Sequence, residues 1–103
     1  MPDLSAYRDL YIQEAGEHMA TLRQSLVVLA GRSDPQPSIR LAFEAAHALK
    51  GISLAMNFTE PATLAAELED YLARALEKEL EVNANVLQVA TTSLEPAIEA
   101  ALS

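Results

Sequence analysis

One histidine is flanked, at helical spacing, by residues that could support nucleophilic chemistry. His47, Lys50 and Gly51 lie within five positions of one another in an alanine-rich segment. At about 100° per residue, His47 lies roughly 200° around a helix from Leu49, the middle of the apolar face. Imidazole is largely neutral near pH 7, so an exposed Nε2 could attack a phosphorus atom without a dedicated base. Lys50 would place an ammonium beside the charge of a transferred phosphoryl group.

Other residues of the same helix face are expected to meet a partner. Gly51 removes side-chain bulk beside His47, although a glycine inside a helix costs about 1 kcal/mol relative to alanine. Phe43 and Leu54, if exposed, would form an apolar ledge for docking. From this face alone, a chance pairing of histidine and lysine stays open, and Phe43 could equally pack beneath the neighbouring helix. The expected docking surface also contains Arg40 and Glu44.

Length and composition limit the kinds of protein that the chain can be. Half of its 103 residues are apolar but only 5% are aromatic, which favours one domain of closely packed helices. A net charge of −8 argues against nucleic acid and anionic membrane as partners. The chain contains no cysteine and shows neither a signal peptide nor a membrane-spanning run. We therefore expect a cytoplasmic protein.

Four amphipathic segments are expected to position these residues. Apolar side chains recur at steps of three and four along most of the chain, the pattern of helices with one buried face. Short connections between the segments favour antiparallel neighbours. The prediction is one all-α domain over residues 1–103, an antiparallel up-down four-helix bundle with helices at about 4–30, 38–56, 60–80 and 84–102.

Particular residues are expected to begin, end or interrupt these helices. Gly31 and Asn57 should end the first and second helices, because both residue types tolerate the left-handed backbone conformation. Thr59 and Asn83 should cap the third and fourth helices at their N-termini. Pro96 should kink or break the last helix.

Three segments of the chain resemble histidine phosphotransfer (HPt) domains. Residues 42–51 read A-F-E-A-A-H-A-L-K-G, where the phosphoacceptor motif of that family is usually F-R-A-A-H-x-L/I-K-G. Residues 11–19 resemble the F-x-x-E-A-x-E-x-L of its first helix, and residues 68–72 the L/M-E-x-L-L of its third. Residues 57–58 are Asn-Phe where the family has Gly-Phe. The similarity covers essentially the whole chain, and the nearest match is to the N-terminal domains of CheA-like chemotaxis histidine kinases.

The resemblance implies a phosphoryl carrier that belongs to a histidine protein kinase and is not catalytic alone. His47 would be phosphorylated, Lys50 would assist through its charge, and Glu69 would accept a hydrogen bond from Nδ1–H of His47. A histidine kinase catalytic domain would supply the phosphoryl group from ATP, and the aspartate of a CheY-like response regulator would receive it. The domain itself would hold no cofactor, since ATP and Mg²⁺ belong to those partners. The isolated domain is expected to be monomeric.

Departures from the family pattern occur at several positions near the site. Glu44 replaces the usual arginine, and Arg40 one turn earlier could compensate for its charge. Ala66 stands where many CheA-like domains have a second histidine. Ile52 and Ser53 replace a smaller Gly/Ala pair. We expect these changes to affect kinetics and partner choice more than the basic role.

Two other functions compete with a phosphoryl carrier. A non-catalytic helical adaptor would dock a receiver domain through Phe43 and Leu54, with His47 incidental. An enzyme acting alone is disfavoured, because the sequence has neither a G-x-x-x-x-G-K nor a G-x-G-x-x-G nucleotide motif. His18 falls on the apolar face of the first segment and is expected to be a packed structural histidine. Two histidines on different helices give a metal site little support.

Overall fold

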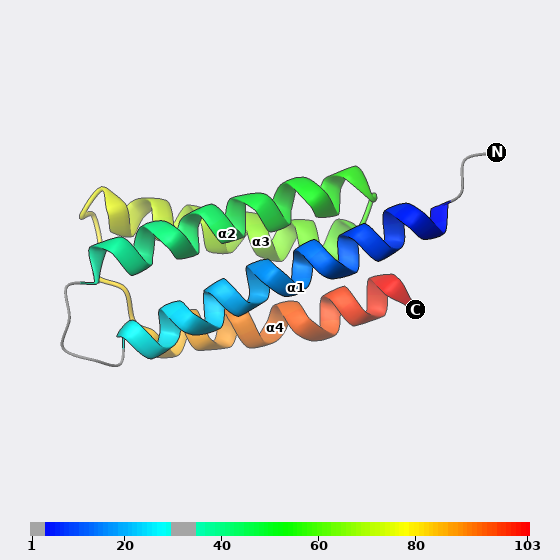
Figure 1. Cartoon of the computed structure of the whole chain (residues 1–103). Helices are drawn as coiled ribbons and strands as arrows, with labels where there is room; N and C mark the ends of the chain where they lie inside the picture. Colours follow the sequence, from blue (N-terminus) through cyan, green and yellow to red (C-terminus); the bar gives the residue numbers. More distant parts are fainter. Residues whose placement is uncertain (1–3, 30–34) are drawn as a thin grey trace.

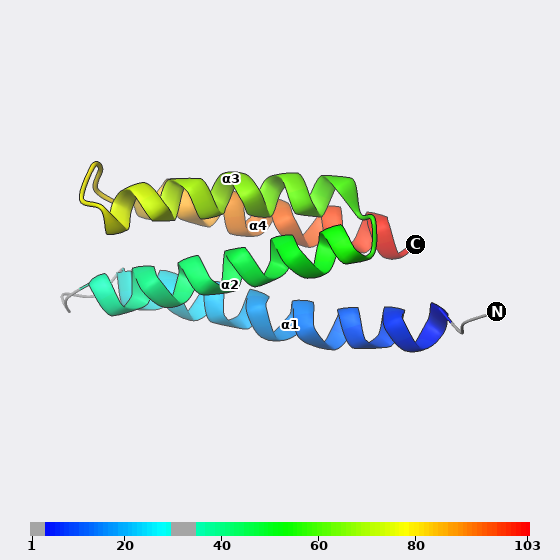
Figure 2. The ribbon, with the colours of Figure 1, turned by 90° about the horizontal axis from the view of Figure 1, so that it is seen from above.

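Four helices account for the secondary structure of the part that the computed structural model describes, residues 4–29 and 35–103. Consecutive helices run in opposite directions, and α1 and α3 each pack against α2 and α4 (Figure 1). Figure 2 shows α2 lying between α1 and α3. The predicted antiparallel four-helix bundle is confirmed. The helices are α1 (Leu4–Leu29), α2 (Gln36–Ala55), α3 (Thr59–Leu76) and α4 (Ala84–Leu102).

The core combines large and very small side chains. Fully buried leucines come from all four helices, while α2 and α3 also contribute fully buried alanines. Small side chains at a contact let two helices approach closely. The outer edges of α2 and α3 are therefore near enough for polar side chains to meet across them. The fully buried leucines and alanines of the core are Leu22, Leu49, Leu72, Leu87, Leu94, Ala42, Ala46 and Ala65.

A buried polar pair joins α1 to α2. The hydroxyl oxygens of Tyr11 and Ser53 lie 3.0 Å apart, and both residues are buried. Burial raises the pKa of Tyr11, and the hydrogen bond with Ser53 offsets only part of that effect. The ring of Tyr11 also meets Phe58 edge-on at a centroid distance of 5.0 Å. Ser53, which departs from the family pattern, thus satisfies a buried phenol.

The end of α2 follows the sequence prediction closely. Asn57 has a φ of 61°, which is the left-handed conformation expected of it. Its amide donates to the carbonyl of Leu54, and the amide of Phe58 donates to that of Ser53. This double hydrogen bond is a Schellman motif, which satisfies carbonyls that a helix end leaves free.

The end of α3 corrects the prediction. The helix stops at Leu76 instead of continuing to about residue 80. Lys78 takes a φ of 61°, and the amides of Lys78 and Glu79 donate to the carbonyls of Ala75 and Arg74 in a second Schellman motif. The apolar side chain after this turn, Leu80, packs against the core from outside the helix.

The starts of α2 and α3 also differ from expectation. α2 begins at Gln36, two residues early, because Pro37 fits the first turn of a helix. The prediction that Thr59 caps α3 is wrong: the N-cap is Phe58, and Thr59 is the first helical residue. Phe58 carries no capping oxygen in its side chain, and its contact with Tyr11 holds the chain there instead.

The boundaries of α4 confirm one prediction and correct another. Oδ1 of Asn83 accepts hydrogen bonds from the amides of Asn85 and Val86, so the predicted N-cap is confirmed. α4 continues as one helix through Pro96, so a break there is wrong. Buried residues on both sides of the proline, Leu94 and Ala97, hold the helix against the core. The predicted end of α1 at Gly31 lies outside the described residues.

Two polar contacts tie α1 to α4, one at the C-terminal end of α4 and one near its middle. Arg8 donates to the carbonyl of Leu102 at 2.6 Å, and Arg23 forms an ion pair with Glu95. Both contacts are exposed and so add little stability. Within residues 4–29 and 35–103, no helix is long and apolar enough to cross a membrane.

Candidate functional site

His47 projects from the outer face of α2. Its side chain is 65% exposed, whereas Leu49, almost opposite on the helix, is 1% exposed in the core. The periodicity of α2 fixes this orientation, because burying Ala42, Ala46 and Leu49 turns His47 outward. An imidazole in this position is accessible to a second protein.

A carboxylate from α3 holds one nitrogen of this ring. Oε1 of Glu69 lies 3.0 Å from Nδ1 of His47, and the Glu69 side chain is only 15% exposed. A carboxylate at Nδ1 favours the tautomer that carries its proton there. The lone pair of Nε2 is then left for a reaction.

Lys50 completes a three-residue network. Its Nζ donates to Oε1 of Glu69 at 3.2 Å and lies 2.7 Å from Oε2. Oε1 is therefore shared between the lysine and His47, while the lysine also contacts Oε2. The Lys50 side chain is 31% exposed and extends toward α3, because residue 50 lies on the α3 side of the His47 face.

The charge of Glu69 follows from these contacts. Desolvation by itself would raise the pKa of Glu69. The hydrogen bonds from Lys50 and His47, with the positive charge of Lys50, outweigh it and hold the pKa below its ordinary value of 4.5. Glu69 is thus an ionised acceptor at neutral pH, beside a histidine that needs a partner for its proton.

The predicted docking residues divide into exposed and partly packed ones. Leu54 is 62% exposed, and Arg40, Glu44 and Gly51 are exposed as well. Phe43 is half-buried against the core, with its ring tilted only 19° from the imidazole plane at a centroid distance of 6.4 Å. Phe43 therefore packs partly inward, as the alternative prediction had it. Leu54 is the more exposed of the two apolar residues.

Gly51 is not required by the fold. A Cβ added to it would meet no atom of the described chain within 4 Å, and its backbone φ is ordinary for a helix. Gly51 therefore destabilises α2 without allowing any closer packing within the domain. Gly16 on α1 has the same open surroundings.

The remaining sequence-based candidates lie away from this network. His18 is half-buried on α1, as expected for a packed structural histidine. Ala66, which sequence reasoning treated only as a missing histidine, lines a small pocket together with Lys50. The pocket could not be predicted from the sequence, because it depends on how α2 and α3 meet.

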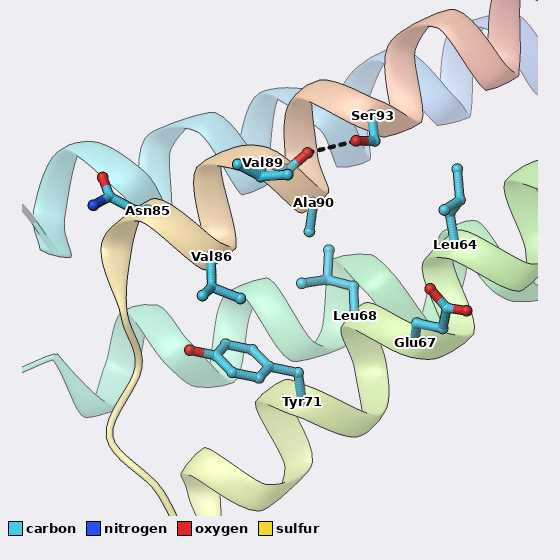
Figure 3. Close-up of a pocket in the computed structure, with 9 residues that line it drawn as sticks. All are labelled: Leu64, Glu67, Leu68, Tyr71, Asn85, Val86, Val89, Ala90 and Ser93. Atoms are coloured by element: carbon cyan, nitrogen blue, oxygen red, sulfur yellow. Dashed lines mark hydrogen bonds between the residues drawn. The ribbon is translucent and has the colours of Figure 1, made fainter.

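A larger apolar groove lies between α3 and α4 (Figure 3). Leu68 and Tyr71 of α3 face Val86 and Ala90 of α4 across it. Tyr71 is two residues beyond Glu69, which places it about 200° around the helix. The groove is therefore separate from the His47 network.

The sequence model of the Hpt domain family matches residues 6–103. The chain belongs to the Hpt domain family. Nearly all of this Hpt domain, including all three residues of the network, lies within the matched range.

Curated relatives of the Hpt domain are chemotaxis proteins. It is 31% identical over 93 residues to the chemotaxis protein CheA of Bacillus subtilis, which covers 90% of this chain. It is 30% identical over 84 residues to the CheA of Listeria monocytogenes, which covers 82% of this chain. In both cases the Hpt domain spans only 14% of the relative's length.

A solved structure shares the fold. The CheA phosphotransferase domain from Thermotoga maritima superposes with a TM-score of 0.86 at 24% sequence identity. The similarity covers 99% of this chain and 100% of that domain. The four-helix arrangement is therefore that of a known phosphotransferase domain.

Proposed function

We propose that this Hpt domain carries a phosphoryl group on His47 in a chemotaxis-type signalling system. A histidine kinase catalytic domain supplies the group from ATP, and the aspartate of a CheY-like response regulator receives it. The observation that supports this most is the 3.0 Å contact of Glu69 with Nδ1 of a histidine that is 65% exposed. The CheA relatives favour the chemotaxis setting, and with it a cytoplasmic location.

The first step is nucleophilic attack by Nε2 of His47 on the γ-phosphorus of ATP. The N–P bond forms as the bond from phosphorus to the bridging oxygen breaks, and ADP leaves with that electron pair. The imidazole becomes more positive as it donates its lone pair. The ionised Glu69 stabilises that charge through the Nδ1 hydrogen bond, with the proton remaining at Nδ1.

The second step returns the electron pair to His47. A carboxylate oxygen of the receiver aspartate attacks the same phosphorus, the N–P bond breaks, and Nε2 recovers its lone pair. ATP and Mg²⁺ act here as the partners' substrate and ion. The Hpt domain contributes position and charge, which are the main requirements of phosphoryl transfer.

Lys50 has two roles in this proposal. It neutralises Glu69 at rest, which keeps that carboxylate ionised although it is largely buried. It also lies one helical turn from His47, where its ammonium can reach a phosphoryl group on the ring. Gly51 and Leu54 form the surface on which a partner rests, the first by its lack of bulk and the second by its exposed apolar side chain.

The test is a labelling experiment with γ-³²P-labelled ATP and a CheA-type kinase catalytic domain. We expect acid-labile, alkali-stable label on the Hpt domain only when kinase is present, and its loss on addition of a receiver domain with Mg²⁺. His47→Gln should abolish the label, whereas His18→Gln, the matched control on α1, should retain it. Label that survives His47→Gln would remove the assigned site.

A helical adaptor is the second candidate, and the 62% exposure of Leu54 is the observation that favours it. An adaptor predicts that a receiver binds equally well with and without phosphate and that His47→Gln leaves its binding unchanged. The labelling experiment separates the two functions, since an adaptor transfers no phosphate.

A further inference from the structure

A small pocket opens beside the His47 network, between the second half of α2 and the first half of α3. Its walls are mainly apolar, and its volume is about 220 Å³. An engineered protein cavity of about 150 Å³ is enough to hold benzene, so this space can take one aliphatic or aromatic side chain. The residues that matter here are Lys50, Leu54, Phe58, Ala62, Thr63 and Ala66.

Ala66 contributes one of the two small side chains that line this pocket. It is half-buried on α3, one turn before Glu69, and its methyl group is all that it places in the pocket. Ala62, one turn earlier, is buried and equally small. A larger side chain at position 66 would occupy the space that these two alanines leave open.

The pocket is continuous with the surface around His47. Lys50 lines it and also contacts Glu69, so pocket and network share a residue. Leu54 forms another wall and lies within about 20° of His47 on the face of α2. A protein surface that reaches Nε2 from this side therefore covers the mouth of the pocket.

The receiver is the partner whose chemistry requires this close contact. An aspartate side chain is short, so the receiver surface must rest on the helices around His47 before its carboxylate can reach the phosphorus. ATP instead presents its γ-phosphoryl group at the end of a flexible triphosphate, and the kinase surface can stay further away. Apolar contacts next to the reacting atoms therefore favour the receiver.

We propose that the pocket beside Lys50 seats one apolar side chain of the receiver domain, and that Ala66 selects receivers by setting its depth. This inference rests on the proposed phosphotransfer from His47. It makes position 66 a specificity determinant. Many of the CheA-like domains that this chain resembles have a histidine there.

To test this proposal, the pocket is filled by substitution and phosphoryl transfer from His47 to a receiver domain is measured. Ala66→Leu should reduce the kcat/KM of transfer by about tenfold, mainly through a higher KM, because a buried apolar anchor can no longer insert. Ala90→Leu makes the same change in the α3–α4 groove of Figure 3 and should transfer as wild type. Leu54→Ala, which removes an exposed wall, should act like Ala66→Leu even if the latter folds poorly.

Labelling by phosphoramidate provides the internal reference. In that reaction Nε2 of His47 forms its bond to phosphorus as ammonia leaves, and no protein partner is needed. Ala66→Leu should leave this rate unchanged, which shows that the His47 network is intact.

Each other result has a definite meaning. Wild-type transfer by both Ala66→Leu and Leu54→Ala overturns the pocket proposal and leaves phosphotransfer standing. An equal slowing with phosphoramidate, or an equal effect of Ala90→Leu, also overturns it. Slower labelling by the kinase with normal transfer to the receiver overturns the choice of occupant. Absence of label in the wild type, with kinase and phosphoramidate alike, overturns the proposed function itself.

Discussion

The ring nitrogen of His47 that is bonded to Glu69 is not the nitrogen that would carry phosphate. This separation lets Glu69 act at 3.0 Å from Nδ1 without blocking Nε2. The proposed mechanism requires an ionised Glu69, because a protonated carboxyl group could not accept the Nδ1 hydrogen bond in the same way. Lys50 supports that charge with contacts of 2.7 and 3.2 Å.

The lowered pKa of Glu69 predicts how acid affects stability. Its folded-state pKa lies below the ordinary value of 4.5, so its stabilising contribution is present above about pH 4.5 and is lost as the pH falls through the folded pKa. The difference in unfolding free energy between wild type and Glu69→Gln should therefore shrink below pH 4.5. Urea denaturation followed by circular dichroism at pH 7 and pH 3 measures it.

The matched variant for this experiment is Glu67→Gln on the same helix. Glu67 is exposed at the α3–α4 groove and belongs to a different face of α3. The difference in unfolding free energy between wild type and Glu67→Gln should change less with pH than the difference for Glu69→Gln. An equal change for both variants would contradict the assigned contacts.

The network itself could be predicted only in part from the sequence. The exposed position of His47 follows from helical periodicity, and the resemblance to HPt domains pointed to Glu69. The pairing of Lys50 with Glu69 could not be foreseen, because it depends on the spacing of α2 and α3 and on side-chain direction. That spacing is set by alanines whose packing partners the sequence does not reveal.

Among the helices, α2 carries the clearest conflict between stability and function. Gly51 weakens the helix and has open space around its Cα. Gly51→Ala should therefore stabilise the domain by about 0.5–1 kcal/mol. Gly16→Ala on α1, which is equally exposed, should stabilise it by a similar amount.

Only Gly51→Ala is expected to slow phosphoryl transfer to a receiver, since its methyl group stands next to His47. Thermal unfolding gives the stability of both variants, and transfer kinetics give the function. Unchanged transfer by Gly51→Ala would show that the missing side chain does not serve partner approach.

The turn after α3 predicts a stabilising substitution. Lys78 adopts a φ of 61°, a conformation that costs a residue with a Cβ roughly 1–2 kcal/mol. Lys78→Gly should be about 1 kcal/mol more stable than Lys78→Ala, because both lose the side chain but only glycine relieves the strain. Chemical denaturation of the two variants tests this, and equal stabilities would contradict it.

Helix ends show why sequence prediction succeeded at one turn and failed at another. Asn57 is a residue type that favours the left-handed conformation, so its role was visible in the sequence. Lysine is not, and the Schellman motif at Lys78 forms because Leu80 reaches back to the core. Pro96 was expected to kink or break α4, and the break does not occur because buried neighbours keep α4 helical through it.

At the scale of the whole molecule, the bundle is elongated and strongly acidic. Its principal extents are 50 × 21 × 19 Å, and its net charge is −8. The bundle topology was accessible from the sequence, because four amphipathic segments with short connections have few ways to bury their apolar faces. The grooves between the helices could not be predicted from the sequence, because they depend on how individual side chains pack.

The charge of the bundle supports the prediction that the isolated domain is monomeric, because like charges oppose self-association. Light scattering should give a mass near 11.1 kDa, and small-angle X-ray scattering a radius of gyration slightly above the 13.9 Å of the Cα atoms. A mass of twice that value at micromolar concentration would contradict the prediction.

Nuclear magnetic resonance can show directly which atom of the domain carries the phosphoryl group. The ¹⁵N-histidine-labelled domain would be phosphorylated with kinase and ATP and examined by ³¹P and ¹H–¹⁵N correlation spectra. We expect one phosphorus signal, coupled to Nε2 of His47, with the proton retained on Nδ1 and no change at His18. Phosphate on Nδ1 of His47, on His18 or on a residue other than histidine would contradict it.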